Sequence, residues 1–159
     1  MPTFAGQSMS RFIHIRSSKF PILAGEKEEL VNDGMYGKAL AEYLRSRLSE
    51  RGYDAPFVCC EDWGWWVELK TAPFAFGVCI YSGHEEDGPV DFVCTDGASG
   101  RKKWSWKKLR FIETSPWADK LFDDMVAIFQ ADDGVEIVAV SEEFPDLDAS
   151  TSTDQRTKP

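Results

Sequence analysis

A stripe of apolar residues recurs at every fourth position between residues 36 and 51, formed by Tyr36, Leu40, Leu44 and Leu48. This spacing predicts an amphipathic helix, because positions four apart lie on one helical face. Asp33 is the predicted N-cap, and Gly52 stands where a helix commonly ends in a left-handed residue.

The pattern changes to strict alternation after this helix. Trp65, Val67 and Leu69 alternate with more polar neighbours, which predicts a strand with one buried face. The segment from Phe57 to Cys60 predicts a short preceding strand. The connection between the two strands contains Glu61, Asp62, Trp63 and Gly64, and Gly64 indicates a tight bend there.

The remaining periodic segments complete the expected fold. Strands are predicted at Phe12–Arg16, Phe74–Tyr81, Asp91–Thr95 and Val135–Val140, and a second amphipathic helix begins at Ser115-Pro116 and closes before Gly134. The expected order is β-α-β-β-β-β(β)-α-β. This order predicts a two-layer α+β domain with two amphipathic helices and a mostly antiparallel sheet of five to seven strands.

The domain boundaries follow from where apolar residues stop. Residues 1–10 are small and polar apart from one phenylalanine, which predicts a flexible arm. Residues 11–144 form the single predicted domain. Residues 145–159 are rich in Ser, Thr and Asp, which predicts a disordered and dispensable tail.

Charge narrows the range of partners. The formal net charge is −9, which disfavours nucleic acid and anionic membranes and favours a basic protein partner. Glu26, Glu28 and Glu29 form an acidic cluster that is expected to be a solvated face. No apolar run approaches the length of a membrane span.

The four cysteines show no metal-ligand spacing, and the two histidines do not complete a zinc pattern. Cys59, Cys60 and Cys79 lie in apolar strand-like runs, which predicts buried free thiols and therefore a reducing compartment. No apolar leader is visible at the N-terminus, and we expect a cytoplasmic protein.

One segment has a net charge opposite in sign to that of the whole chain. Residues 101–110 contain six cationic and no acidic residues, with Trp104 and Trp106 between them, while the remaining residues carry 12 positive and 27 negative charges. Three interpretations stay open. The segment is an edge strand protected by lysines, a strip that binds nucleic acid by phosphate contact and stacking, or an internal clamp on an acidic segment.

Asp62, followed by Glu68-Leu69-Lys70, is the one pattern with a catalytic interpretation. Two carboxylates and a lysine can hold Mg²⁺ and activate water against a phosphodiester. The pattern resembles the core of the PD-(D/E)xK nucleases over roughly residues 36–140, although no proline precedes Asp62. The resemblance implies catalytic Asp62, Glu68 and Lys70 with Mg²⁺ as cofactor.

A second resemblance rests on Tyr36-Gly37-Lys38-Ala39-Leu40, on Gly52-Tyr53 at the helix end, and on Glu61-Asp62-Trp63-Gly64-Trp65. This layout is similar to a group of small bacterial proteins with an E-D-W-G-W segment after the first helix. The likeness covers most of residues 12–140 and implies a compact protein of a bacterial cytoplasm.

The first functional hypothesis is a non-enzymatic acidic binding protein without cofactor, of the kind found among immunity and antitoxin factors, directed against a basic protein. Its expected site contains Glu61, Asp62, Trp63, Trp65 and Trp66, since aromatic side chains dominate interface energies and rim carboxylates steer basic partners. The alternatives are the metal-dependent nuclease and a small-ligand-binding domain with a pocket lined by Trp63, Trp65 and Trp66.

Overall fold

The structure is a computed structural model that describes residues 11–83, 88–97, 102–105, 110–113 and 115–147. Six strands in the described residues form one open sheet in the order β2-β3-β4-β5-β1-β8, and all neighbours are antiparallel. They are β1 (Phe12–Arg16), β2 (Val58–Cys60), β3 (Trp65–Leu69), β4 (Phe76–Ser82), β5 (Asp91–Asp96) and β8 (Glu136–Ser141). The predicted α+β fold class is confirmed.

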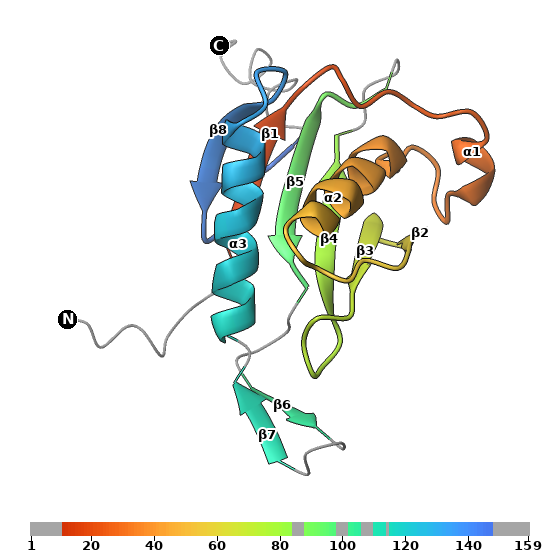
Figure 1. Cartoon of the computed structure of the whole chain (residues 1–159). Helices are drawn as coiled ribbons and strands as arrows, with labels where there is room; N and C mark the ends of the chain where they lie inside the picture. Colours follow the sequence, from red (N-terminus) through yellow and green to blue (C-terminus); the bar gives the residue numbers. More distant parts are fainter. Residues whose placement is uncertain (1–10, 84–87, 98–101, 106–109, 114, 148–159) are drawn as a thin grey trace, which may run out of the picture.

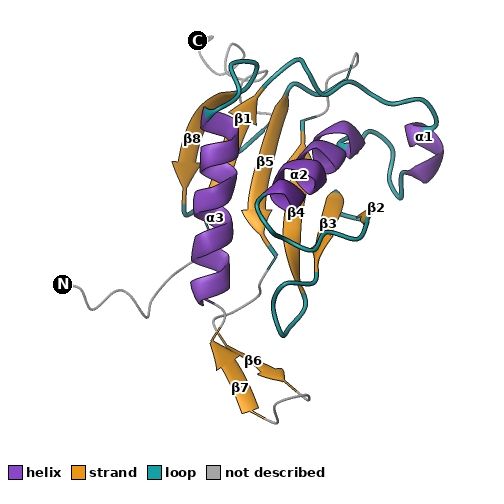
Figure 2. Ribbon diagram, viewed as in Figure 1, coloured by secondary structure: helices purple, strands orange, loops and turns teal. Residues whose placement is uncertain are grey.

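Three helices are described: α1 (Glu26–Glu29), α2 (Lys38–Glu50) and α3 (Ser115–Gln130). Figures 1 and 2 show the two long helices, α2 and α3, lying side by side on one face of the sheet. The core lies between these two layers, where Leu40, Leu44, Leu121 and Phe129 are fully buried. The opposite side of the sheet, which we call the open face, carries no described helix.

The predicted alternation of β3 is confirmed. Trp65, Val67 and Leu69 are almost completely buried under the helices, whereas Trp66 and Glu68 on the open face are only partly buried. Pairing with β4 fixes this register, with Val67 opposite Val78. A shift by one residue would move the whole apolar set to the open face, so the helix layer determines the register.

The predicted N-cap of α2 is wrong, because the helix begins at Lys38, well after Asp33, and no side chain caps its N-terminus locally. Glu26 from α1 performs this role from a distance. Its Oε2 accepts hydrogen bonds from the Gly37 and Lys38 backbone N–H groups at 2.8 and 2.9 Å, and its Oε1 accepts one from Leu23 at 2.9 Å. Glu26 is fully buried, so its assignment to a solvated acidic face is also wrong.

The basic segment is not an edge strand of the main sheet. β6 (Lys102–Ser105) and β7 (Arg110–Glu113) pair only with each other among the described strands and form a separate antiparallel hairpin. Figure 1 shows this hairpin beyond the N-terminal end of α3 and away from the six-stranded sheet. Of the two tryptophans, Trp106 lies outside the described residues.

Two further expectations need correction. Pro145, Asp146 and Leu147, assigned to the tail, line a cavity in the folded body, while residues 148–159 and the predicted arm at 1–10 lie outside the described residues. Cys59, Cys60 and Cys79 are free, as predicted, but they are partly exposed instead of buried, whereas the fourth free cysteine, Cys94, is buried.

Candidate functional site

The turn between β2 and β3 presents two carboxylates. The Glu61 backbone N–H donates to the Gly64 carbonyl at 2.7 Å, which closes the turn and leaves the Glu61 and Asp62 side chains exposed. Asn32 Nδ2 donates to the Asp62 carbonyl at 2.7 Å and ties the turn to the segment before α2. Gly64 is required here, because a Cβ would lie 2.2 Å from the Ile80 carbonyl oxygen.

The three neighbouring indoles lie in three different environments. Trp65 is 1% exposed, and its Nε1–H donates to the Met35 carbonyl at 2.8 Å, so it belongs to the core and not to an exposed site. Trp66 lies on the open face. Trp63 lies in the turn and packs against Tyr81 with ring centroids 5.4 Å apart. Of the predicted aromatic set, only Trp63 and Trp66 are available to a partner or ligand.

Trp66 is held in place on the open face. Its Nε1–H donates to Glu68 Oε1 at 2.7 Å, and its six-membered ring occupies the space above Gly77 and Gly97. A Cβ at Gly97 would lie 2.2 Å from the Trp66 Cζ3 atom. The two glycines therefore make room for an indole that shields the sheet backbone, and Trp66 has a structural role as well as partial exposure.

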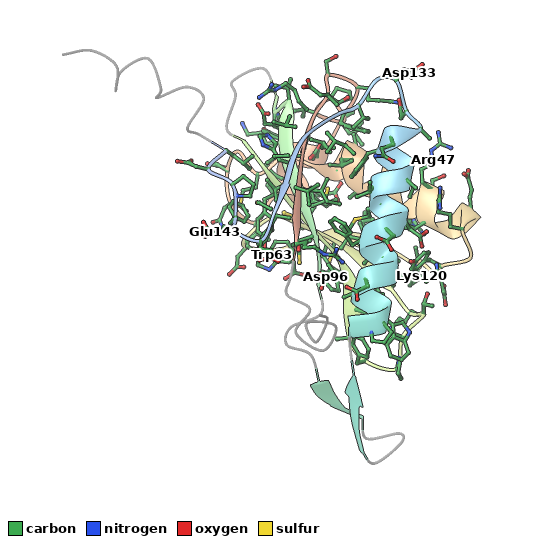
Figure 3. All side chains as sticks on the ribbon, turned by 90° about the vertical axis from the view of Figure 1, so that its left-hand side faces the viewer. Arg47, Trp63, Asp96, Lys120, Asp133 and Glu143 are labelled. Atoms are coloured by element: carbon green, nitrogen blue, oxygen red, sulfur yellow. The ribbon has the colours of Figure 1, made fainter. Side chains whose placement is uncertain are left out.

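Trp63 and the C-terminal segment enclose an apolar cavity of about 490 Å³. Tyr81 lines this cavity and packs edge-on against Phe144, with ring centroids 4.9 Å apart, and Phe144 also packs on Phe12 with centroids 5.4 Å apart. Trp63 lines the cavity from the turn between β2 and β3, and Phe144 and Leu147 line it from the C-terminal segment; we call these two sets its walls. We call this space the aromatic cavity. Figure 3 shows Trp63 and Glu143 on the side of the sheet away from α3.

Carboxylates stand close in the sequence to the residues that line the aromatic cavity. Asp146 is the only charged residue among the nine described residues that line it. Exposed carboxylates flank both walls in the sequence, with Glu61 and Asp62 before Trp63, and Glu142 and Glu143 before Phe144. An apolar interior, with exposed carboxylates on residues that adjoin its lining in the sequence, suits a ligand or side chain that is both apolar and cationic.

The nuclease residues are not brought together as that hypothesis requires. Glu68 accepts the Trp66 indole N–H and lies 3.6 Å from Lys70 Nζ. Asp62 lies in the turn before β3, whereas Glu68 is the fourth residue of the strand, about 10 Å along it at the usual rise per residue. Among the described residues, no group of three or more His, Cys, Asp and Glu side chains could hold a metal ion.

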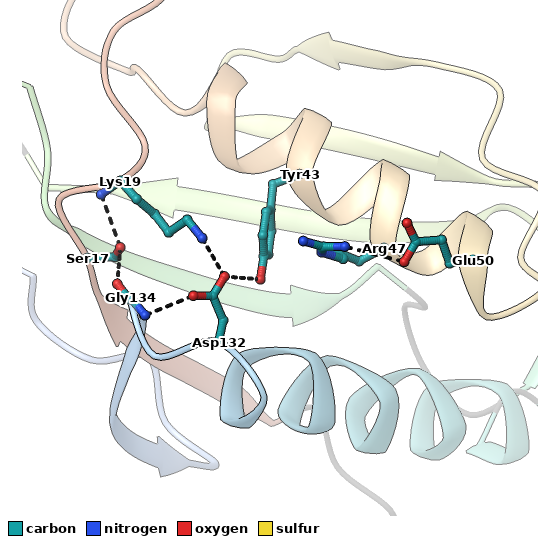
Figure 4. A network of polar contacts seen from close by, with 7 residues as sticks. All are labelled: Ser17, Lys19, Tyr43, Arg47, Glu50, Asp132 and Gly134. Carbon is teal, nitrogen blue, oxygen red and sulfur yellow. Dashed lines mark hydrogen bonds and ion pairs between the residues drawn. The ribbon is translucent and has the colours of Figure 1, made fainter.

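A network of hydrogen bonds and ion pairs connects α2 to the C-terminal end of α3 (Figure 4). Asp132 Oδ2 accepts hydrogen bonds from Lys19 Nζ at 2.5 Å and from the Tyr43 hydroxyl at 2.7 Å. Its Oδ1 accepts the Gly134 backbone N–H at 2.8 Å. The nearby Arg47 pairs with Glu50, so the cleft of about 620 Å³ at this place presents paired charges.

These contacts shift two pKa values in opposite directions. The hydrogen bond from Lys19, followed by those from Tyr43 and Gly134, lowers the pKa of Asp132 to about 2. Burial, followed by the hydrogen bond to Asp132, raises the pKa of Tyr43 to about 12. The network therefore favours the ionised carboxylate and the neutral phenol, and it ties α2 to α3 over a wide range of pH.

The acid limb of stability should depend on this network. Because the pKa of Asp132 is lower in the folded state than the ordinary 3.8, its contribution is present above pH 3.8 and is lost as the pH falls towards about 2. Urea unfolding at a series of pH values should therefore show a shallower acid limb for Asp132→Asn than for wild type. Asp133→Asn, at an exposed neighbouring position, is the matched control and should keep the wild-type slope.

A second network joins the segment that follows α2 to the middle of α3. The Tyr53 hydroxyl donates to Asp124 Oδ2 at 2.6 Å, and Lys120 Nζ donates to the same oxygen at 2.7 Å. Arg51 completes the cluster at 3.1 Å from Asp124 Oδ1. Burial, ahead of the hydrogen bond to Asp124, raises the pKa of Tyr53. The hydroxyls of Tyr43 and Tyr53 act as structural hydrogen-bond donors, from α2 to the residue Asp132 after α3, and from the segment after α2 to Asp124 in α3.

A histidine–carboxylate pair on the open face was missed in the sequence. His14 Nε2 lies 2.8 Å from Asp91 Oδ1, and Arg16 Nε donates to the same oxygen at 3.0 Å. The Asp91 side chain is 7% exposed, so Arg16 and His14 compensate a nearly buried carboxylate. The partners are 77 residues apart in the sequence, and no local pattern could have indicated the pair.

The thiols show no activation. Burial, followed by the contact with Glu61, raises the pKa of Cys59 to about 11, and burial raises that of Cys79 to about 11. Burial likewise raises the pKa of Cys60 and Cys94. A thiol is a nucleophile in its ionised form, so these cysteines are poor nucleophiles at neutral pH.

Comparisons with known proteins identify no relative of this chain, so the functional argument rests on the geometry described above. No protein-family model, no curated protein and no solved structure matches the chain. Among the described helices, none has the length and apolar character needed to cross a membrane.

Proposed function

We propose that this protein is a non-enzymatic, acidic binding protein of the immunity or antitoxin type, and that its partner is a basic protein. The observation that carries the proposal is the aromatic cavity, whose walls are flanked by exposed carboxylates. An apolar side chain of the partner enters between Trp63 and Phe144, and cationic residues beside it meet Glu61 and Asp62. The free cysteines and the bacterial resemblance support a bacterial cytoplasmic setting.

The aromatic and the acidic residues of the proposed site contribute differently to binding. Aromatic side chains that become desolvated supply most of the binding energy of an interface, whereas rim charges mainly raise the association rate. Glu61 and Asp62 are exposed and stand next to Trp63, so they are placed to steer a basic partner to the cavity. The net charge of −9 adds a long-range attraction for the same basic partner.

Charge reversal in the turn tests the proposal. The partner is captured from the source cells at low salt and purified, and its association is then measured by surface plasmon resonance. We expect a basic protein, an association rate that falls as salt rises, and a loss of affinity of about tenfold or more for Glu61→Lys/Asp62→Lys. Glu28→Lys/Asp133→Lys has the same change of net charge at exposed positions elsewhere, and should have a much smaller effect. Equal effects of the two double variants would contradict the proposed site.

One observation favours a second candidate, the small-ligand-binding domain. The aromatic cavity of about 490 Å³ has the size of small-molecule sites. A hydrophobic ligand would suit its aromatic interior, and an amine group on it would suit the exposed carboxylates Glu61 and Asp62 beside Trp63 in the sequence. Screening a panel of hydrophobic amines by ligand-observed NMR would favour this candidate if binding is lost in Trp63→Ala and no basic protein is captured.

A further inference from the structure

The basic hairpin is the segment of the fold that the proposed function leaves unused. β6 and β7 pair with each other and not with the main sheet, so they are not a protected edge of that sheet. A two-stranded hairpin is at best marginally stable in water without further packing. In register, Trp104 stands opposite Phe111, and Lys103 stands opposite Ile112. The hairpin thus carries both aromatic and cationic residues, and among the described strands it pairs with no part of the main sheet.

The chain itself contains a surface of complementary character. Residues 101–110 carry six positive charges and no negative ones, while the remaining residues carry 12 positive and 27 negative charges. The aromatic cavity with Glu61 and Asp62 requires a partner segment that is basic and rich in apolar side chains, and the hairpin combines both properties. Figure 1 shows the hairpin extending away from the body, which leaves it accessible to another molecule.

We infer that the aromatic cavity of one copy accepts the β6–β7 hairpin of a second copy. Reciprocal insertion gives a closed, two-fold dimer in which each subunit donates one hairpin and offers one acidic site. This inference rests on the proposed function, because it uses the same acidic and aromatic site. It also makes a prediction about regulation, since an external basic partner competes with the hairpin for that site.

Single-stranded nucleic acid is the alternative ligand that a basic hairpin containing a tryptophan could bind. Charge decides against it. Nucleic acid would have to approach a body in which negative charges greatly outnumber positive ones, whereas the acidic site of a second copy is attracted to the hairpin. The test below includes an oligonucleotide so that this outcome is visible.

A charge exchange between two variants tests the dimer. Sedimentation velocity on the full chain at low salt, from micromolar to several hundred micromolar protein, should show a dimer that dissociates as salt rises. Lys102→Glu/Lys103→Glu and Glu61→Lys/Asp62→Lys should each weaken self-association by about tenfold or more, because like charges then oppose each other. An equimolar mixture of the two variants should form a heterodimer, since both of its interfaces bring opposite charges together again.

Several results would overturn the inference. They are a wild-type protein that stays monomeric throughout this range, a dimer that survives in both variants, and a mixture that remains monomeric although both variants keep the wild-type circular dichroism and melting temperature. Binding of fluorescent oligo-dT that requires Lys102 and Lys103, without self-association, would assign the hairpin to nucleic acid instead. The proposed function fails separately, because its test measures an external basic protein against Glu61 and Asp62 and does not involve the hairpin.

Discussion

Glu26→Ala is expected to lower the free energy of unfolding by about 4 kcal/mol, since it removes a charged acceptor from three backbone N–H groups. Two of these groups lie at the N-terminus of α2, where the helix dipole adds to the loss. Glu26 is fully buried, so bulk water does not solvate these N–H groups in the folded protein. A typical domain has only about 5–15 kcal/mol of stability, so the variant should be close to unfolding at physiological temperature.

Urea denaturation measures this loss, with Glu28→Ala as the matched control. Glu28 belongs to the same short helix but is exposed, so its removal should change stability by about 0.5 kcal/mol or less. Glu26→Gln keeps one carbonyl acceptor and should fall between the two. If Glu26→Ala and Glu28→Ala unfold at the same urea concentration, the long-range capping role is wrong.

The second large effect concerns Trp63 and Trp65, which are close in the sequence but lie in different environments. Trp65→Ala should cost about 3–5 kcal/mol, because the indole is buried and its N–H is bonded to the Met35 carbonyl. Trp63→Ala should cost about 1 kcal/mol, since Trp63 is only partly buried and its loss removes less apolar area. Partner affinity should show the opposite order, with a loss of tenfold or more for Trp63→Ala.

Both quantities must be measured on the same preparations. Chemical denaturation gives the stability, and binding is measured at a temperature at which both variants are folded. Trp65→Phe, which keeps an aromatic core residue, should restore much of the stability and bind like wild type. A folded Trp63→Ala variant with wild-type affinity for the basic partner would exclude the aromatic cavity as its site.

The elements with strong periodicity were predictable. The apolar stripe of α2 and the alternation of β3 are local patterns, and each follows from the geometry of a helix or strand packed against one core. The α+β class and the approximate order of elements then followed from their sequence. The exposed acidic turn at Glu61 and Asp62 was likewise visible, because it lies between two predicted strands.

The candidate site was only half visible. Three tryptophans in four residues indicated an aromatic site. Trp65 instead lies in the core, where its indole N–H is bonded to Met35. Trp66 lies on the sheet, because Gly77 and Gly97 have no side chains to displace it. The C-terminal wall of the cavity comes from Phe144, the last residue of the predicted domain, and from Leu147, in the segment predicted to be a tail. Its order depends on contact with Tyr81 and Phe12.

The sequence by itself determined which stretches become helices and strands, because hydrophobic periodicity is a property of neighbours along the chain. Only the tertiary structure decided that Glu26 caps α2, that His14 meets Asp91, and that the basic strands pair with each other instead of joining the sheet. These outcomes depend on groups brought together from distant positions. Their energies come from burial and hydrogen bonding that exist only once the sheet and its helix layer have formed.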